Sequence, residues 1–396
     1  MWSALASGAG GAGAAAEAPP PATSWPEWAQ GKNAKARAKG RWRETKDFDA
    51  FGPRGALSDG HNVVSFAAND YLGLSSHPKV LSAAHEAIDR WGTGSGASRL
   101  VSGSRPVHAQ LEQALADWKS TEAALIFPTG YAANLGALSA LAGPQVLICS
   151  DEHNHASIID GCRLAHDLGA RVEFFPHADA GAVRGLLGSW TGRAIVVTDA
   201  VFSMDGDHAP VRELARACAD HDALLVLDEA HSVLAPHVGP LPCEALRVGT
   251  LSKTLGSLGG FVAGARVMTE MLVNRCRPFI FTTAPAPADA AAARAALEVL
   301  RSAEGAALVR RLEGYADRFS RPGTGRSPIV PIVVGAERAA LEAAAALLRE
   351  GLLVPAIRPP TVPPGRSRLR VTLSAAHTAE EIGRLTEALG RHGLWP

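Results

Sequence analysis

The sequence predicts an α/β protein built on a largely parallel β-sheet that helices cover on both faces. The first observation is that short β-branched runs alternate with stretches of helical periodicity from Val63 onward, a pattern typical of βαβ units. The second is that small and polar residues directly follow most of these runs. Ligands of such sheets bind beyond the carboxyl ends of the strands, so these residues are the candidates for a functional site.

The expected elements follow one another at regular spacing. The strands are expected at 123–127, 146–149, 172–175, 194–198, 224–227 and 261–263, with helices at 108–118, 156–168 and 211–221. A further strand-like stretch ends just before Lys253. Strands at 329–334 and 368–373 and helices at 341–349 and 379–391 indicate a small C-terminal α+β domain from about Pro285. On its last strand, Arg366, Arg368 and Arg370 are expected to form a solvated face.

Composition argues against several classes of function. The 39 basic residues balance the 39 acidic ones, so neither nucleic acid nor an anionic membrane surface is expected as a partner. No apolar run approaches the roughly 20 residues that span a bilayer. The five cysteines are scattered and form no CxxC pair, which favours a reducing, cytoplasmic compartment over a disulfide framework or a zinc site.

The first 62 residues are expected to lie outside the sheet. Residues 1–30 are rich in Ala, Gly and Pro and poor in charge. A segment of this composition cannot bury enough apolar surface to fold, so a disordered tail is expected. Residues 31–62 are expected to form an N-terminal arm, whose basic and aromatic first part favours a helix.

Five strand ends in succession carry side chains of complementary chemistry. They supply a glycine turn, imidazoles, a hydroxyl, a carboxylate and an amine, at Gly130 and Tyr131, His153 and His155, Ser203, Asp228 and His231, and Thr250 and Lys253. Lys253 has no charged residue within five positions on either side. Desolvation lowers the pKa of such a lysine and makes it a nucleophile for a Schiff base, although a solvated lysine in a glycine-rich loop is an equal alternative for this run alone.

Together these groups meet the needs of one cofactor, pyridoxal phosphate. A lysine binds its aldehyde, an aspartate keeps its ring nitrogen protonated so that the ring accepts electrons, and a flat side chain stacks on the ring. The free N–H groups that open a helix suit its phosphate. His153 and His155 could instead bind a metal, but no third ligand has matching spacing, and no metal site is predicted. Asp228 and His231 could alternatively be a helix cap and a satisfied histidine.

Five motifs in combination resemble those of the α-oxoamine synthases, fold-type I pyridoxal-phosphate enzymes that condense an amino acid with an acyl thioester and release CO2. The motifs lie at 69–74 (Asn-Asp-Tyr-Leu-Gly-Leu), 94–103, 202–207, 228–231 and 252–253. The stretch 356–377 is most similar to the branch that joins L-alanine to a pimeloyl thioester in biotin synthesis. The resemblance runs from about Asn69 to the C-terminus. It implies a seven-stranded-type sheet in a cofactor-binding domain at 63–284, a small domain at 285–396, and a homodimer.

The resemblance also implies roles for individual residues. Lys253 would hold the cofactor and act as acid and base, His155 would stack on the ring, and Asp228 would pair with its nitrogen. His231 would hydrogen-bond the phenolic oxygen. The phosphate or ring edge would be bound by Gly130, Tyr131, Ser203 and Thr250, and the substrates by Arg43, Asn69, Arg358 and Thr361.

Two departures from the family pattern concern the segments around Asp228. Relatives usually continue the Asp-x-Ala-His motif with a glycine-rich loop, whereas residues 232–239 read Ser-Val-Leu-Ala-Pro-His-Val-Gly and the segment up to Lys253 is shorter. A different substrate length or different dimer contacts would follow. Asp199 stands where a glutamate is often found.

Several interpretations stay open at this stage. The acyl group would arrive on coenzyme A or on an acyl-carrier protein. The alternatives in activity are glycine C-acetyltransferase and another synthase of the family with a different acyl chain. A non-catalytic partner subunit is the alternative of another class, and the presence of Lys253 argues against it.

Overall fold

The structure is a computed structural model that describes residues 24–236, 238–320 and 325–395. Its contacts divide the chain into two units, Met1–Lys46 and Asp47–Pro396. In the first unit, α1 (Trp25–Ala38) begins with a capping box in which Ser24 and Glu27 satisfy each other's backbone N–H groups. The prediction of a tail up to residue 30 was therefore wrong for residues 25–30, because composition does not register such a cap. Residues 1–23 lie outside the described residues.

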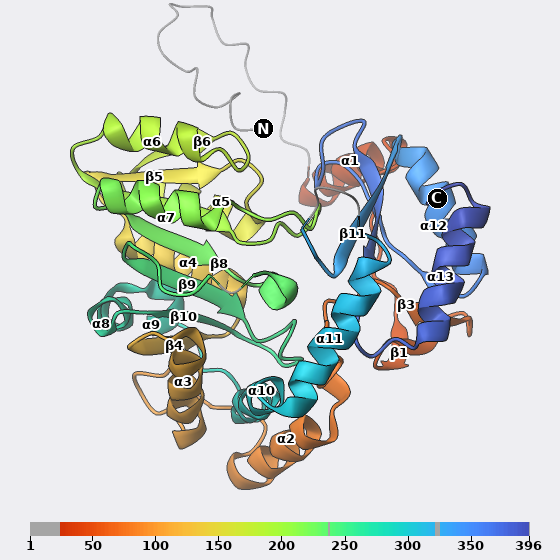
Figure 1. The fold of residues 1–396 in the computed structure, drawn as a ribbon, viewed down its shortest axis with the longest axis horizontal. Helices are drawn as coiled ribbons and strands as arrows, with labels where there is room; N and C mark the ends of the chain where they lie inside the picture. Colours follow the sequence, from red (N-terminus) through yellow and green to blue (C-terminus); the bar gives the residue numbers. More distant parts are fainter. Residues whose placement is uncertain (1–23, 237, 321–324, 396) are drawn as a thin grey trace, which may run out of the picture. The chain divides into compact units, whose positions relative to one another are not determined.

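The second unit contains the predicted mainly parallel sheet (Figure 1). Its order is β4 (Ala123–Phe127), β10 (Gly260–Gly264), β9 (Ala245–Thr250), β8 (Leu224–Asp228), β7 (Arg193–Asp199), β5 (Val146–Asp151) and β6 (Arg171–Phe175). All neighbours from β9 to β6 pair in parallel, whereas β10 runs antiparallel to both β4 and β9. The expected strands and the sheet type are confirmed.

Helices cover both faces of this sheet. Successive side chains of a strand point to opposite faces, and here both sets are apolar and need to be buried. Ile148 and Val226 belong to the core beneath α4 (Gly130–Leu141), α5 (Ala156–Asp167) and α8 (Arg266–Arg275). Cys149 and Leu227, the next residues along the same strands, belong to the core beneath α6 (Ala180–Gly188) and α7 (Val211–Asp220). A further helix, α3 (Pro106–Lys119), packs on β4 and β10 at the edge of the sheet.

Two smaller sheets complete the second unit. One is antiparallel, with the order β11 (Ile329–Gly335), β14 (Ser367–Thr372) and β13 (Ala356–Ile357), and it is accompanied by α12 (Glu337–Arg349) and α13 (Ala379–Arg391). The other joins β1 (Phe48–Phe51), β2 (Arg54–Leu57) and β3 (Asn62–Ser65) to β12 (Leu352–Leu353). Residues 48–62 of the expected arm are thus in a sheet with a C-terminal strand. The domain boundaries at 62/63 and 284/285 stay predictions.

The arginines of β14 are not the solvated face that was expected. Arg368 and Arg370 are only 2% and 5% exposed, and Arg366 alone is exposed. The prediction failed because the loop after β7 supplies acceptors for the buried guanidinium groups. Arg368 pairs with Asp205, and Arg370 Nε donates to the carbonyl oxygen of Ser203 at 2.6 Å.

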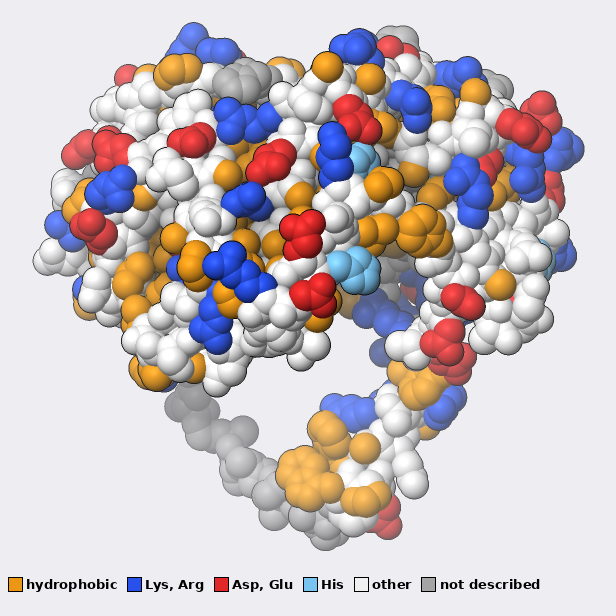
Figure 2. Space-filling view, turned by 90° about the horizontal axis from the view of Figure 1, so that it is seen from below, with side chains coloured by type: hydrophobic (Ala, Val, Ile, Leu, Met, Phe, Trp, Pro, Cys, Tyr) orange, Lys and Arg blue, Asp and Glu red, His pale blue; other side chains and the backbone are white. Residues whose placement is uncertain are grey.

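The surface charge of the protein is mixed in sign. On the face that Figure 2 shows, Lys and Arg side chains are interspersed with Asp and Glu side chains. Among the residues that the structure describes, no helix combines the length and the apolar character needed to cross a lipid bilayer. All five cysteines are free thiols.

Candidate active site

The carboxyl ends of the central strands surround a cavity of about 190 Å3, here called the lysine pocket. Its lining includes seven of the residues that the sequence analysis selected: Gly130, Tyr131, His155, Asp228, His231, Thr250 and Lys253. They follow β4, β5, β8 and β9, and Asp199 at the end of β7 joins them. The sheet therefore brings these separate motifs to one place, as the rule for ligand sites in parallel sheets predicts.

Lys253 stands in the turn that follows β9. Its Nζ lies 2.8 Å from His231 Nε2, and burial lowers its pKa, while the carboxylates of Asp228 and Asp199 act in the opposite direction. The turn is fixed by Gly256, whose φ is +59° and whose added Cβ would come within 2.2 Å of the Ser75 nitrogen. A partly desolvated amine in a fixed turn is a candidate nucleophile.

Two carboxylates lie side by side in the lysine pocket. Asp199 and Asp228 are register partners on the parallel strands β7 and β8, so their side chains project from the same face. Burial, and secondarily the charge of Asp228, raise the pKa of Asp199 well above its ordinary value. Asp228 accepts hydrogen bonds from Asn134 Nδ2 at 2.6 Å and from the Ala230 N–H at 2.9 Å. These two donors fix the orientation of the Asp228 carboxyl group.

His155 is the N-cap residue of α5, and its backbone N–H donates to Asp199 Oδ2 at 2.8 Å. Burial lowers the pKa of its imidazole, which leaves a neutral flat ring at the pocket. His153 is directed elsewhere, because it stacks on His177 with ring centroids 4.2 Å apart. The described residues contain no group of three or more His, Cys, Asp or Glu that could hold a metal ion.

The start of α4 forms another wall of the pocket. Thr129 caps this helix by accepting hydrogen bonds from the N–H groups of Ala132 and Ala133. Helix geometry leaves the N–H groups of Gly130 and Tyr131 without intrahelical acceptors, and such an end attracts anions. A Cβ added at Gly130 would lie 3.2 Å from the Thr250 Cβ, so glycine keeps this wall open.

Five of the sequence-predicted residues do not line the lysine pocket. Ser203 offers its backbone oxygen to Arg370, and Asn69 Oδ1 lies 3.2 Å from the hydroxyl of Tyr71, which in turn contacts the pocket residue His231. Arg358 and Thr361 lie in the turn after β13. Arg43 belongs to the first unit. The substrate-binding roles of Arg43, Asn69, Arg358 and Thr361 stay predictions.

Sequence reasoning gave no role to two residues that shape the pocket. Asn134 lies four positions after Gly130, on the same side of α4, and its amide donates to both Asp228 and Ser157. Tyr71 is fully buried, and its hydroxyl lies 2.5 Å from His231 Nδ1. The 3.6-residue period of α4 is a signal for Asn134, whereas nothing local in the sequence indicates which side chain Tyr71 meets.

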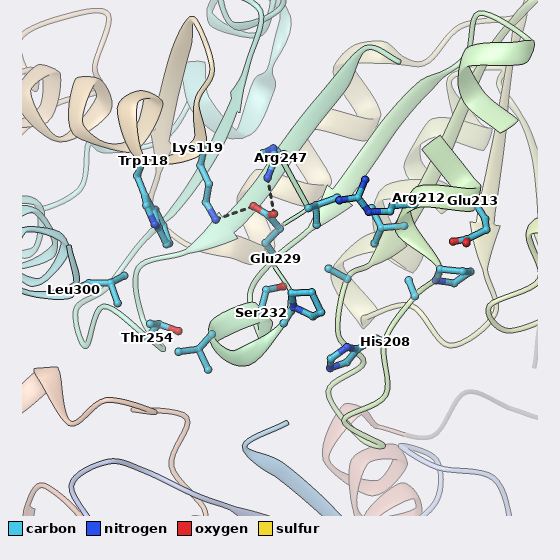
Figure 3. A pocket seen from close by; sticks show the side chains of 18 of the residues that line it. Trp118, Lys119, His208, Arg212, Glu213, Glu229, Ser232, Arg247, Thr254 and Leu300 are labelled. Carbon is cyan, nitrogen blue, oxygen red and sulfur yellow. Dashed lines mark hydrogen bonds and ion pairs between the residues drawn. The ribbon is translucent and has the colours of Figure 1, made fainter. Parts of the chain in front are cut away.

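A second cavity, of about 570 Å3, lies on the other side of β8 (Figure 3). Successive strand residues face opposite ways, and Glu229 accordingly points away from Asp228. Its carboxylate lies 2.8 Å from Lys119 Nζ and 3.0 Å from Arg247 Nη1. The loop that departs from the family pattern, residues 232–239, contributes Val233, Ala235 and Pro236, among others, to this second cavity, whereas none of its described residues lines the lysine pocket.

The donor set of the lysine pocket fits pyridoxal phosphate. It combines a lysine amine of lowered pKa, a buried aspartate, a neutral imidazole and a helix N-terminus. Asn134 Oδ1 is buried and has no hydrogen-bond partner in the described chain, so it offers a free acceptor beside Asp228. The volume is below the roughly 300–1,000 Å3 of drug-sized ligand sites and suits a single substituted ring.

Comparison with known proteins agrees with this geometry. Residues 61–389 match the family model described as aminotransferase class I and II. An 8-amino-7-oxononanoate synthase of a Methylobacterium species is 46% identical over 93% of this chain and 97% of its own length. The enzyme of that name from Geobacter sulfurreducens is 43% identical over 92% and 97%.

Two solved structures support the assignment of the fold. A serine palmitoyltransferase of Sphingomonas wittichii is 30% identical and superposes with a TM-score of 0.82 over 94% of this chain and 98% of that one. An 8-amino-7-oxononanoate synthase from Francisella tularensis, 24% identical, superposes with a TM-score of 0.69 over 84% and 98%. The chain belongs to the class I and II aminotransferase family and, within it, to the α-oxoamine synthases.

Proposed function

We propose that this chain condenses L-alanine with a pimeloyl thioester, in a reaction that depends on pyridoxal phosphate, to give 8-amino-7-oxononanoate, CO2 and a free thiol. The observation that carries the proposal is the meeting of Lys253 and His231, 2.8 Å apart, with Asp228 in one pocket. The 43–46% identity to synthases named for this product, over more than nine tenths of the chain, selects the substrates.

The residues of the lysine pocket divide the task between them. Pyridoxal phosphate supplies an aldehyde that binds an amine and a protonated ring that accepts the electrons of a carbanion. Lys253 would hold the aldehyde, Asp228 would keep the ring nitrogen protonated, and His155 would cover the ring. The N-terminus of α4 at Gly130 and the hydroxyl of Thr250 would hold the phosphate.

Lys253 is also the proton carrier of the reaction. Its amine, whose pKa burial lowers, can accept the α-proton of L-alanine near neutral pH. The α-carbon of alanine then bonds to the thioester carbonyl carbon while the C–S bond breaks and the thiol leaves. Loss of the alanine carboxylate as CO2 follows, and Lys253 returns a proton to the same carbon.

The assembly and the acyl carrier belong to the same proposal. We infer a homodimer, in line with the family resemblance, and sedimentation of the purified chain across a dilution series tests it. The five free thiols support a reducing, cytoplasmic location. Comparing turnover with the pimeloyl thioester of coenzyme A and that of acyl-carrier protein distinguishes the two carriers.

The decisive experiment measures thiol release by the purified full chain, with the product identified by mass spectrometry. L-alanine and pimeloyl-coenzyme A together should give 8-amino-7-oxononanoate. Lys253→Ala should abolish turnover. It should also abolish the permanent attachment of the cofactor to the protein that borohydride reduction produces in the wild type. Wild-type turnover in that variant would refute the role of Lys253, and a preference for glycine with acetyl-coenzyme A would favour glycine C-acetyltransferase.

A further inference from the structure

We propose that Tyr71 fixes the tautomer of His231, keeping the ring proton on Nε2 so that His231 presents an N–H donor to the unprotonated amine of Lys253 and to the lysine pocket. Tyr71 would thus be a positioning residue that acts through His231. The inference deepens the proposed function and rests on it only for its catalytic consequence. The tautomer itself follows from the contacts around the two side chains.

Both ring nitrogens of His231 have a single close partner. Nδ1 lies 2.5 Å from the Tyr71 hydroxyl, and Nε2 lies 2.8 Å from Lys253 Nζ. His231 and Tyr71 are 4% and 0% exposed, so water does not compete for these positions. The imidazole therefore joins a fully buried tyrosine to the candidate nucleophile.

His231 is neutral in this environment, which is why its tautomer matters. Burial lowers its pKa well below the ordinary value, and positive charge on Lys253, whenever its amine is protonated, and on Arg370 acts in the same direction, with a smaller effect of His155. The charges of Asp228 and Asp199 act on Lys253 and are not among the influences on the pKa of His231. A neutral imidazole has one N–H and one acceptor nitrogen, and only one of them can face Lys253.

The surroundings of Tyr71 direct its proton to His231. The tyrosine hydroxyl has one proton and two candidate acceptors, His231 Nδ1 at 2.5 Å and Asn69 Oδ1 at 3.2 Å. Asn69 Oδ1 already accepts from Arg370 Nη2 at 3.1 Å. The imidazole nitrogen is the nearer acceptor, so a hydrogen bond from Tyr71 to Nδ1 is favoured.

Arg370 holds this arrangement in one orientation. Its guanidinium is buried, has donors only, and interacts with the Tyr71 oxygen. It is itself fixed by the Ser203 carbonyl oxygen at 2.6 Å and by Thr372 Oγ1 at 2.8 Å. Since Arg370 cannot accept a proton, the hydroxyl of Tyr71 turns its hydrogen away from it, toward His231.

The first test observes the tautomer directly. The full chain, loaded with pyridoxal phosphate and labelled with 15N in its histidine rings, gives long-range 1H–15N spectra that separate protonated from unprotonated nitrogens. Comparison with His231→Gln assigns the resonances among the 14 histidines. We expect the proton on Nε2; a proton on Nδ1 would overturn the proposal. This result is independent of which substrates the enzyme uses, so it separates failure of this inference from failure of the proposed function.

The second test removes the hydroxyl of Tyr71. In Tyr71→Phe, nothing holds the ring proton of His231 on Nε2. The visible absorption band of the protein loaded with pyridoxal phosphate changes with pH, and the midpoint of this change should rise by about 1 pH unit, the effect of one hydrogen bond to a charged group. The kcat should fall about 10-fold with the KM for L-alanine nearly unchanged. An unchanged midpoint and tautomer would refute the inference.

Tyr315→Phe is the matched control. Tyr315 is also buried, and its hydroxyl donates to the His377 carbonyl oxygen at 3.0 Å without touching the lysine pocket. This variant should lose a comparable hydrogen bond and a little stability, but its absorption midpoint and kcat should match the wild type. Should Tyr71→Phe fail to fold, the spectrum of the wild-type chain still decides the question.

Discussion

Two neighbouring carboxylates show how single residues acquire their chemistry in this site. Asp199 and Asp228 are paired across β7 and β8, and only Asp228 receives a side-chain amide, that of Asn134. Burial, and secondarily the charge of Asp228, raise the pKa of Asp199, so Asp199 holds a proton more readily than an ordinary aspartate. Two neighbouring carboxyl groups thereby differ because their surroundings differ.

Replacing Asp199 should therefore stabilise the protein in a pH-dependent way. A raised pKa in the folded state means that folding binds a proton, and this becomes increasingly unfavourable as pH rises above the ordinary aspartate value. Asp199→Asn should raise the melting temperature by about 1 °C at pH 8, the effect of roughly 1 kcal/mol on a chain of this length, and change it little at pH 4. Thermal unfolding of both proteins over this pH range checks the expectation; an equal shift at both pH values would contradict it.

Asn134→Ala probes the other carboxylate. The substitution removes the 2.6 Å hydrogen bond to Asp228, which is worth about 1.5 kcal/mol for a charged acceptor. We expect the dissociation constant of pyridoxal phosphate, measured by absorbance titration, to rise about 10-fold. Ser139→Ala, on the same helix and with only a backbone acceptor at Gly136, should leave it unchanged.

The sequence allowed the site residues at strand ends to be selected, but it did not reveal which side chains they contact. Lys253, Asp228 and His155 could be selected because their place after a strand fixes their location in the fold. Tyr71 could not, since its partner His231 is distant in sequence and the contact exists only after folding. Arg370 was misjudged for the same reason, because the carbonyl oxygen that accepts from it belongs to another element.

At the scale of elements, β14 of the C-terminal sheet contacts the loop that follows β7, at the end of the large sheet where the lysine pocket lies. All six of its residues are buried. Arg368 binds the Met204 carbonyl oxygen at 3.2 Å and pairs with Asp205, and Arg370 binds Ser203. The loop after β7 is thereby held by a strand that is far from it in sequence.

Removing one of these guanidinium groups should loosen that loop. Arg368→Ala leaves Asp205 without its buried cation and should cost about 3 kcal/mol of unfolding free energy, measured by urea denaturation. Arg366→Ala, two positions earlier and exposed, should change it by less than about 0.5 kcal/mol. Equal effects of the two substitutions would mean that the buried contacts of Arg368 add nothing.

Elements with strong periodicity were placed well from the sequence. The helix expected at 379–391 is found at Ala379–Arg391, where Thr378 and Glu381 form a capping box. The antiparallel direction of β10 was not foreseeable, because Phe261 and its neighbours are buried and apolar in either direction. The strands at 48–65 were missed since they are only four residues long and partly polar.

For the molecule as a whole, His177 makes stability depend on pH. Its ring joins Asp151 at 3.1 Å to Asp207 at 2.6 Å, and these hydrogen bonds raise its pKa to about 10. Because the folded-state pKa lies above the unfolded value of about 6.5, the contribution is fully present below about pH 6.5. It is lost as pH rises toward 10.

The stability difference between the wild type and His177→Gln should follow this curve. We expect the variant to melt at a lower temperature at pH 6 and the gap to shrink steadily as the pH approaches 10. Calorimetry at several pH values measures the gap, with His166→Gln as a control, because that side chain is exposed. A gap that does not change with pH would show that the charge of His177 has no part in stability.

The late position of Arg370 in the chain has a consequence for biosynthesis. Tyr71, His231 and Lys253 all leave the ribosome before the arginine that orients Tyr71 has been translated. Burial lowers the pKa of Lys253, and the charge of Arg370 acts in the same direction. The environment that tunes this lysine is thus completed only by the last part of the chain to be translated.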